Sequence, residues 1–416
     1  MKKLITLVLS AAMLLSLLCV TAFAEGTEIP VADAEELLAA ITNASEGDTI
    51  KLTGDIEYDS WIQVNKPITL DLNGYTITYT GVEVESGFVF LWPGADLTVK
   101  DTGTNGTIGT INSGNMSGAI VLWGDGNTPV ILTIDGGKLI GKEYAISGNG
   151  MQHNTKITVN DGVLTSDSLC IYHPQIGELT VNGGTFTAPD SAIEMRSGSL
   201  TINGGTFTAT KDAFSCEHNG NGTTTSGAAI AIAQHTTKNP ISVTIKGGTF
   251  TGVKALNESN PENNPAPQVT MSIQGGTFTG DVTVADATSK FITGGTFSEN
   301  VAEYIDDAEV AEVLIDNTYY VGDAATAAIK ALRPGQQVTV VAGSVKIGLI
   351  TLEEGKTYTY PKNNNKNNTT NNNNNTNSGT TITQSPKTAD AGIAVYGVMS
   401  VMSLLGMGYV SKRKSR

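Results

Sequence analysis

A six-residue motif recurs five times in the middle of the chain and restricts its fold more than any other feature. Each copy is a β-branched residue, a polar residue, two glycines, threonine and phenylalanine, and the copies occupy 181–186, 202–207, 245–250, 273–278 and 292–297. The first glycines stand at 183, 204, 247, 275 and 294, so the unit is about 21 residues with insertions. Looser copies lie at 134–139 and 159–164, with an early relative at 72–75. Repeats of this length indicate a solenoid.

The motif predicts a strand, a sharp corner and a second strand. Residues 179–181 alternate as in a strand, and glycine tolerates the positive φ that a sharp corner needs. In Thr-Phe-Thr, alternation places phenylalanine inside and threonine outside. No helix-forming stretch interrupts residues 50–300, which argues against crossover helices. We therefore expect an all-β parallel β-helix over 50–300, with one internal column made of Phe186, Phe207, Phe250, Phe278 and Phe297.

Both flanks of the repeat have the patterns of caps. Asp33 with Glu36 three residues later forms a capping-box pattern, and Ala34, Leu37, Leu38 and Ile41 make an apolar stripe at helical spacing. We expect a helical cap within 25–49 that closes one end of the coil. Residues 301–361 combine a helix-like segment at 324–332 with strands at 337–342 and 346–352, which predicts a small α+β C-terminal cap.

The N-terminal 24 residues have the pattern of a secretory signal peptide. Lys2 and Lys3 precede an apolar run over 4–20, and Ala-Phe-Ala at 22–24 is a small-x-small cleavage pattern. An uncleaved membrane anchor is the alternative. Cleavage would leave two cysteines, Cys170 and Cys216, in the exported chain, which is too few for a disulfide-rich scaffold.

The C-terminal end has three parts. An Asn-rich polar tract over 362–384 is expected to be a disordered stalk, an apolar stretch over 391–410 is long enough to cross a bilayer, and a basic tail occupies 412–416. A short motif lies between the stalk and the apolar stretch. It consists of Ser385, Pro386, Lys387, Thr388 and Ala389.

This order over 385–416 resembles the cell-wall sorting signal of Gram-positive surface proteins, whose pattern is Leu-Pro-x-Thr-Gly. Pro386 and Thr388 match that pattern, whereas Ser385 and Ala389 depart from it. The resemblance implies sortase and peptidoglycan as partners, passage through the membrane before sorting, and a final place in the cell wall. A plain membrane anchor is the alternative, and it too would place the protein at the cell surface.

Repeats, caps and stalk together resemble the right-handed β-helix surface proteins related to the pectate-lyase superfold. The resemblance covers residues 27–300 and implies a right-handed coil, without a catalytic signature. The formal net charge of −15, from 25 Lys and Arg against 40 Asp and Glu, excludes a nucleic-acid footprint. Such a chain also needs a cation, for example calcium, to hold an anionic polymer.

A further strand is expected in each coil, and these strands define a candidate binding face. They run over 119–123, 145–149, 169–173, 192–196 and 213–217. The expected inward column is Ile120, Ile146, Cys170, Ile193 and Phe214. Cys170 and Cys216 would then both point inward about two coils, or roughly 10 Å, apart, which predicts two free buried thiols.

The outward column on the same strands is the predicted ligand-binding surface. It consists of Trp92, Trp123, Asn149, His173, Arg196 and Glu217, with Glu194 and Ser215 beside it. Tryptophan rings offer flat apolar faces to sugars, and the polar end could hydrogen-bond hydroxyls or carboxylates. The alternative is structural: loops cover the rings, and Arg196 with Glu194 and Glu217 forms a cross-strand salt ladder.

Catalysis is a second hypothesis on this face. The resemblance to pectate lyases implies an arginine base and calcium-binding carboxylates, for which Arg196 and the acidic residues near it are the candidates. Glu194 and Glu217 on adjacent coils could also form a glycosidase carboxyl pair. Asp190, Glu194, Asp212 and Glu217 are the candidate calcium ligands.

The sequence therefore favours a non-catalytic display or adhesion protein that binds a glycan or a host or neighbouring protein. A wall-anchored polysaccharide lyase or glycoside hydrolase is the alternative. A structural surface protein without a ligand is a third hypothesis.

Overall fold

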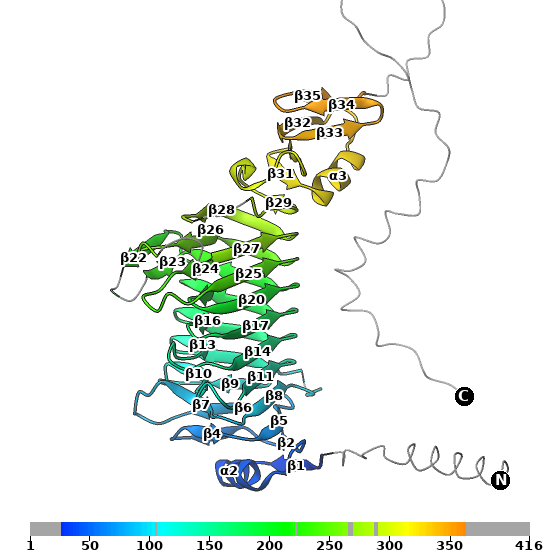
Figure 1. Cartoon of the computed structure of the whole chain (residues 1–416). Helices are drawn as coiled ribbons and strands as arrows, with labels where there is room; N and C mark the ends of the chain where they lie inside the picture. The colour runs from blue at the N-terminus through cyan, green and yellow to red at the C-terminus, as the bar shows by residue number, and fades with distance from the viewer. Residues whose placement is uncertain are drawn as a thin grey trace, which may run out of the picture. The chain divides into compact units, whose positions relative to one another are not determined.

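Each repeat contributes three strands, and strands in the same place in successive repeats pair in parallel (Figure 1). The computed structural model describes residues 26–104, 106–218, 220, 223–264, 269–286 and 290–362. Within them the chain winds as a parallel β-solenoid with three faces, which confirms the predicted all-β solenoid.

The first face is a ten-stranded sheet. Its strands are β1 (Glu28–Val31), β2 (Thr49–Leu52), β5 (Pro67–Asp71), β8 (Asp96–Lys100), β11 (Val130–Ile134), β14 (Thr155–Val159), β17 (Gly177–Val181), β20 (Gly198–Ile202), β25 (Ile241–Ile245) and β27 (Val269–Ile273).

The second face follows the Gly-Gly corners. It contains β3 (Ile56–Tyr58), β6 (Thr76–Tyr79), β9 (Thr110–Asn112), β12 (Lys138–Gly141), β15 (Val163–Ser166), β18 (Thr185–Ala188), β21 (Thr206–Ala209), the first parts of β26 (Thr249–Ser259) and β28 (Thr277–Val284), and β29 (Gly295–Phe297).

The third face completes each coil. It contains β4 (Ile62–Val64), β7 (Gly87–Leu91), β10 (Gly118–Leu122), β13 (Tyr144–Ser147), β16 (Leu169–His173), β19 (Ser191–Met195), β24 (Ala228–Ala233) and the later parts of β26 and β28.

The two glycines of each corner have different reasons to be glycine. In the copy at 202–207, Gly205 has φ +108°, a conformation that L side chains rarely adopt. Gly204 has no such φ, but a Cβ there would lie 2.8 Å from the carbonyl oxygen of Asn182 in the preceding coil. The first glycine therefore allows two coils to approach, and the second allows the chain to turn.

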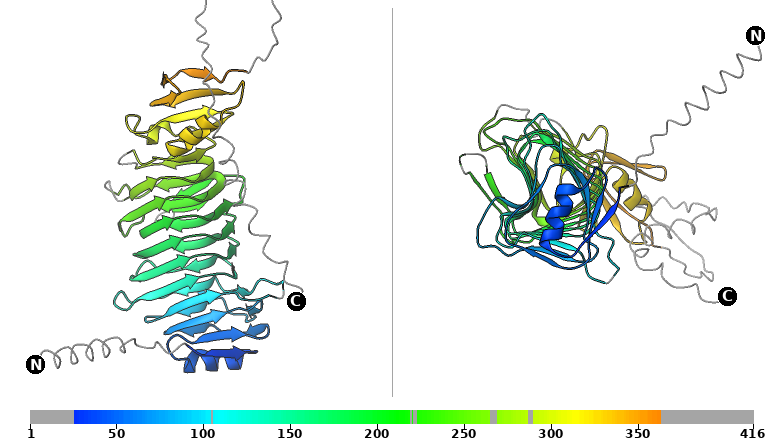
Figure 2. Two further views of the ribbon diagram at one scale, coloured as in Figure 1. Left: turned by 90° about the vertical axis from the view of Figure 1, so that its right-hand side faces the viewer. Right: turned by 90° about the horizontal axis from the view of Figure 1, so that it is seen from below.

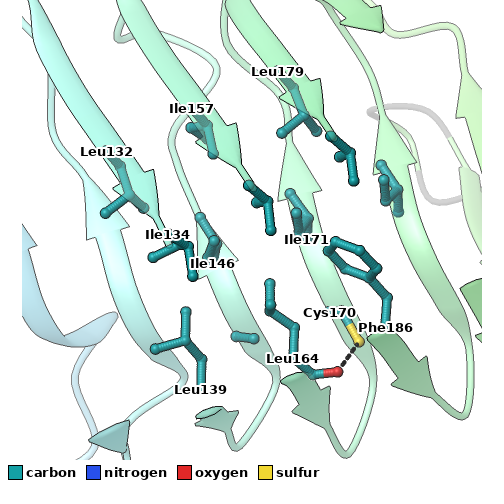
Figure 3. Packing of buried hydrophobic residues seen from close by; sticks show 14 of the residues in the cluster. Leu132, Ile134, Leu139, Ile146, Ile157, Leu164, Cys170, Ile171, Leu179 and Phe186 are labelled. Carbon is teal, nitrogen blue, oxygen red and sulfur yellow. Dashed lines mark hydrogen bonds between the residues drawn. The ribbon is translucent and has the colours of Figure 1, made fainter. Parts of the chain in front are cut away.

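The predicted phenylalanine column is confirmed. From Phe186 to Phe297 the ring centroids are 4.6–5.0 Å apart and the rings are within 15° of parallel. Aliphatic residues continue the column in earlier coils, where Leu139 pairs with Leu164 and Leu164 with Phe186 (Figure 3). Leucine, isoleucine and valine of the first face pack against this column from the other side, which makes one continuous core.

The predicted N-terminal helix is confirmed as α2 (Ala34–Asn43). The Asp33 carboxylate accepts the backbone N–H of Glu36, and Leu37 and Ile41 are buried. Seen from below, α2 lies across the end of the coil (Figure 2). The coil itself starts earlier than the predicted residue 50, because β1 precedes the helix and pairs in parallel with β2.

The C-terminal segment is α+β, as predicted, but one predicted strand is divided. The expected strand at 346–352 is a hairpin of two strands, because Gly348 turns the chain with φ +62°. The elements are η1 (Ala302–Tyr304), β30 (Glu312–Ile315), β31 (Thr318–Val321), α3 (Asp323–Lys330), β32 (Gln337–Ala342), β33 (Ser344–Ile347), β34 (Ile350–Glu353) and β35 (Thr357–Thr359).

The predicted strand at 213–217 is wrong as a member of the third face. These residues belong to an excursion with an antiparallel hairpin, β22 (Ser215–His218) and β23 (Thr223–Ser226), and β24 takes their place in the coil (Figure 1). Ile230 therefore continues the inward column, and Phe214 lies half-buried outside it. Cys216 is only partly buried on this hairpin, so its predicted inward position is wrong.

The predicted register was also one residue off in β16. Ile171, not Cys170, pairs with Ile146 and Ile193. Cys170 is nevertheless fully buried and lies in the column of the small residues Ala145 and Ala192, with its Sγ 3.1 Å from the Leu164 carbonyl oxygen (Figure 3). Both thiols are free, as predicted, but only that of Cys170 is buried.

Truncating the middle of the phenylalanine column should destabilise the solenoid strongly. We expect Phe250→Ala to cost about 3–5 kcal/mol, because it removes a fully buried ring and its stacking with Phe207 and Phe278. Thr249→Ala, next to it but exposed, should change stability by less than about 0.5 kcal/mol. Urea unfolding followed by circular dichroism measures both. Equal midpoints for the two variants would contradict the assignment of the column as core.

Candidate functional site

Four aromatic side chains gather on the outside of the third face, over its first three strands. Trp61 lies 5.5 Å from Phe90, Phe90 lies 6.2 Å from Trp123, and Trp123 lies 6.1 Å from Trp92, measured between ring centroids. Trp61 is 41% exposed, and the other three are half-buried. All three tryptophans of the chain are in this group, which we call the aromatic strip.

Strand alternation explains why these rings face outward. Phe90 pairs with Gln63 of β4 and Val121 of β10, between inward residues such as Leu91 and Leu122. Trp92 and Trp123 directly follow Leu91 and Leu122, which are paired, and their rings therefore lie beside each other. The strip runs from coil to coil along the solenoid rather than along one strand.

A second group of aromatic and charged residues follows on the next coils of the same face. Tyr144 and Tyr172 stack with centroids 5.3 Å apart, and the Arg196 guanidinium lies 5.0 Å from the Tyr172 ring centre. Arg196 Nε donates to Glu194 Oε1 at 2.7 Å, and the two side chains are only 9% and 1% exposed. The arginine is thus held between a ring and a carboxylate.

Burial dominates the electrostatics of this group. It raises the pKa of Tyr144 to about 12. It also raises the pKa of Glu194, and the Arg196 guanidinium opposes that shift. For Arg196, burial by itself lowers the pKa, but the Glu194 carboxylate, with Tyr172 and Tyr144, outweighs it and the pKa is raised. At neutral pH Arg196 is therefore a cation held beside the Glu194 carboxylate.

The four predicted calcium ligands do not form one cluster. Burial by itself raises the pKa of Asp190, but hydrogen bonds from Lys211, Ser226 and Ser168 outweigh it and lower that pKa. Asp212 and Glu217 are exposed on the excursion, and Glu194 is buried against Arg196. Among the described residues, no group of three or more His, Cys, Asp and Glu could hold a metal ion.

The predicted outward column is correct in part. Trp92, Trp123 and Arg196 directly follow the ends of β7, β10 and β19 on this face. Asn149 is exposed in the turn after β13, where its Oδ1 accepts the Met151 N–H. Glu217 belongs to the hairpin instead. The resulting face therefore has aromatic rings at one end and a buried ion pair further along.

His173 is the clearest correction to the predicted column. It pairs with Met195, its side chain is fully buried, and its Nδ1 lies 3.1 Å from the Ser197 carbonyl oxygen. Burial lowers its pKa to about 4, so the imidazole is neutral in the folded protein at pH 7. His173 is an interior residue that no ligand on the outer face can reach.

Four residues of this face were not among the predicted site residues: Trp61, Phe90, Tyr144 and Tyr172. Phe90 stands two residues before Trp92, which was predicted to face outward, so strand alternation alone places Phe90 on the same side. Tyr144 and Tyr172 lay in or beside predicted strands, but the error at Cys170 turned Tyr172 to the wrong side.

A separate hollow of about 760 Å³ lies on the first face. Ile176, Pro129 and Pro240 line it, together with Gly177 and Gly198. Lys156 and Glu178 cross it as an ion pair of 4.0 Å. It contains no aromatic ring, so the aromatic strip remains the better site for a flat ligand.

Comparison of the chain with protein family models, curated proteins and solved structures finds no match. In the part of the chain that the structure describes, no helix is long and apolar enough to cross a membrane. The predicted signal peptide, stalk and sorting segment lie outside the described residues, apart from residue 362.

The buried neutral His173 should make stability depend on pH. Its pKa is about 4 in the folded protein and close to 6.5 when unfolded, so the unfolded state binds more protons below pH 6.5. The contribution of neutral His173 to the free energy of unfolding is fully present above pH 6.5. It declines as the pH falls to about 4, by roughly 3 kcal/mol at 1.36 kcal/mol per pKa unit.

Unfolding in urea at pH 7 and at pH 4.5 measures this effect. His173→Leu removes the titrating group, and we expect it to lose less stability over this interval than the wild type does. The half-buried His153→Leu is the control and should follow the wild type. An unchanged pH dependence in His173→Leu would show that His173 is not buried neutral.

Proposed function

We propose that the protein is a non-catalytic cell-surface protein that binds glycans on the aromatic strip. The observation that carries this proposal is the continuous run of Trp61, Phe90, Trp123 and Trp92 on the outer side of the third face, with neighbouring centroids 5.5–6.2 Å apart and Trp61 41% exposed. Sugar rings have apolar faces and polar edges, and aromatic rings with part of their surface exposed are suited to the faces.

The face also favours binding over catalysis. Glu194 is buried against Arg196, whereas its candidate partner Glu217 lies on the exposed hairpin, so the two are not presented together to a substrate. Arg196 retains its proton and is held by Glu194 and Tyr172. Neither the carboxyl pair of a glycosidase nor the free arginine of a lyase is supported by these contacts.

The negative charge of the chain favours neutral over anionic glycans as ligands. With a formal net charge of −15, the protein repels polyanions in the absence of a bridging cation. Gln63, exposed beside Phe90, supplies a neutral hydrogen-bonding group at the strip. We infer that the preferred ligand is a neutral polysaccharide.

The same proposal includes the place of the protein in the cell. The pattern over 1–24 supports export, and the motif at 385–389 with its apolar stretch and basic tail supports sortase attachment to peptidoglycan. The Asn-rich stalk would hold a right-handed β-helix away from the wall, where the aromatic strip meets glycans of a host or a neighbouring cell.

Glycan binding should depend on the tryptophans. We expect the purified protein to be retained on one of the neutral polymers cellulose, xylan, mannan or chitin, and Trp123→Ala to weaken retention at least tenfold. Tyr360→Ala is the control, because Tyr360 is 38% exposed at the opposite end of the described chain. Affinity electrophoresis measures retention, and an assay for new reducing ends runs in parallel.

Two results would overturn the binding proposal. Release of product that disappears in Glu194→Gln would make the protein an enzyme. Retention that is equal in wild type and Trp123→Ala would move the binding surface away from the aromatic strip.

Wall attachment should depend on Thr388. In a Gram-positive host, we expect the wild-type chain in the fraction released by muramidase, and Thr388→Ala in the membrane fraction. Thr381→Ala, in the stalk, is the control and should leave attachment unchanged. Wild-type protein found only in the membrane fraction would favour the plain membrane anchor.

A further inference from the structure

A polar cluster interrupts the interior of the last coils, where β24, β26 and β28 end on the third face. Glu258 pairs with the inward residues Ile232 and Val284, so its carboxylate occupies a core position. Gln234 and Glu258 are each 2% exposed and Asn264 is 4% exposed, whereas Asp286 is half-buried. The cluster is therefore sealed on the inside and reachable from the side of Asp286.

Two carboxylates meet at one amide in this cluster. Gln234 Nε2 donates to Glu258 Oε1 at 2.9 Å and to Asp286 Oδ2 at 3.0 Å. The other oxygen of Glu258 accepts the backbone N–H groups of Ala285 and Asp286 at 2.8 and 3.0 Å. The Asn260 side chain also donates to Asp286. The same side chain makes two hydrogen bonds with the backbone of Asn264.

The negative charge of this cluster has no matching positive charge. None of the ion pairs among the described residues includes Glu258 or Asp286. Burial raises the pKa of Glu258, and the neighbouring Asp286 carboxylate raises it further. A buried carboxylate without a counter-charge is costly, and two that share a single neutral donor are more so.

Two unpartnered acceptors indicate what the cluster lacks. Gln234 Oε1 and Asn264 Oδ1 are buried and accept no hydrogen bond. Gln234 Oε1 belongs to the amide whose Nε2 touches both carboxylates, and with a cation between them the amide could turn its oxygen inward, since its two ends have nearly the same shape. A positively charged group placed among these buried carboxylate and amide oxygens would stabilise them.

We propose that Glu258, Asp286, Gln234 and Asn264 form a binding site for a hard divalent cation, Ca²⁺. Calcium takes 6–8 oxygen ligands from carboxylates, amide carbonyls and water in flexible geometries. Mg²⁺ demands a nearly ideal octahedron, and zinc prefers the nitrogen and sulfur ligands that these four residues lack. The ion would join β24, β26 and the end of β28, and so fasten the last coils of the solenoid.

Calcium binding is tested on the full-length protein after removal of metal with EDTA. We expect one binding event per chain by titration calorimetry, and a melting temperature several degrees higher in millimolar Ca²⁺ than in EDTA, because a ligand that binds only the folded state stabilises it. Glu258→Gln and Asp286→Asn should bind Ca²⁺ at least tenfold more weakly. Asp190→Asn is the matched control and should bind as the wild type does.

Gln234→Glu provides a second test in case Glu258→Gln and Asp286→Asn fold poorly. It places a third carboxylate beside the other two, so we expect a lower melting temperature in EDTA and a larger rise on adding Ca²⁺ than in the wild type. Failure of Ca²⁺ to restore this variant would overturn the proposal. So would the absence of binding heat in the wild type, an equal response to Mg²⁺, or loss of binding in Asp190→Asn alone.

Discussion

The parallel stacking of identical corners is the constraint on which the rest of this structure depends. A coil can lie directly on the one before it only where no side chain intervenes, and the first glycine of each pair provides that space: at Gly183 a Cβ would lie 2.6 Å from the Asn160 carbonyl oxygen. Once corners are in register, the strands on both sides are in register too. The phenylalanines then stack at 4.6–5.0 Å, close to the spacing of paired strands.

This constraint also explains which parts of the fold the sequence could predict. The first and second faces flank the Gly-Gly motif, so their register follows directly from it, and the inward Phe207 and Phe250 were identified correctly. The third face has no such marker. Its strands are separated from the motif by turns of varying length, and a one-residue error in β16 was enough to place His173 outside instead of inside.

The excursion before β24 has a sequence that resembles a strand of the coil. Residues 213–217 begin with an alternating pattern like that of the true strands, and only the pairing of Ala228–Ala233 with β19 reveals which segment completes the coil. Candidate sites depend on that choice. The strand predicted at 213–217 would place Glu217 beside Glu194 on adjacent coils. In the structure Glu217 lies on the β22–β23 hairpin, so the two carboxyl groups do not form that pair.

The outer and inner surfaces of the third face differ in a way that bears on function. In the early coils its interior is apolar and its exterior carries the rings of Trp61, Phe90, Trp92 and Trp123. In the last coils Glu258 and Gln234 are buried. A solenoid transmits stability from coil to coil, and its terminal coils have a neighbour on one side only or rest on a cap. A cation among the last coils would therefore join the third-face strands near the end of the repeat, while the early coils, closed by α2, hold the aromatic strip.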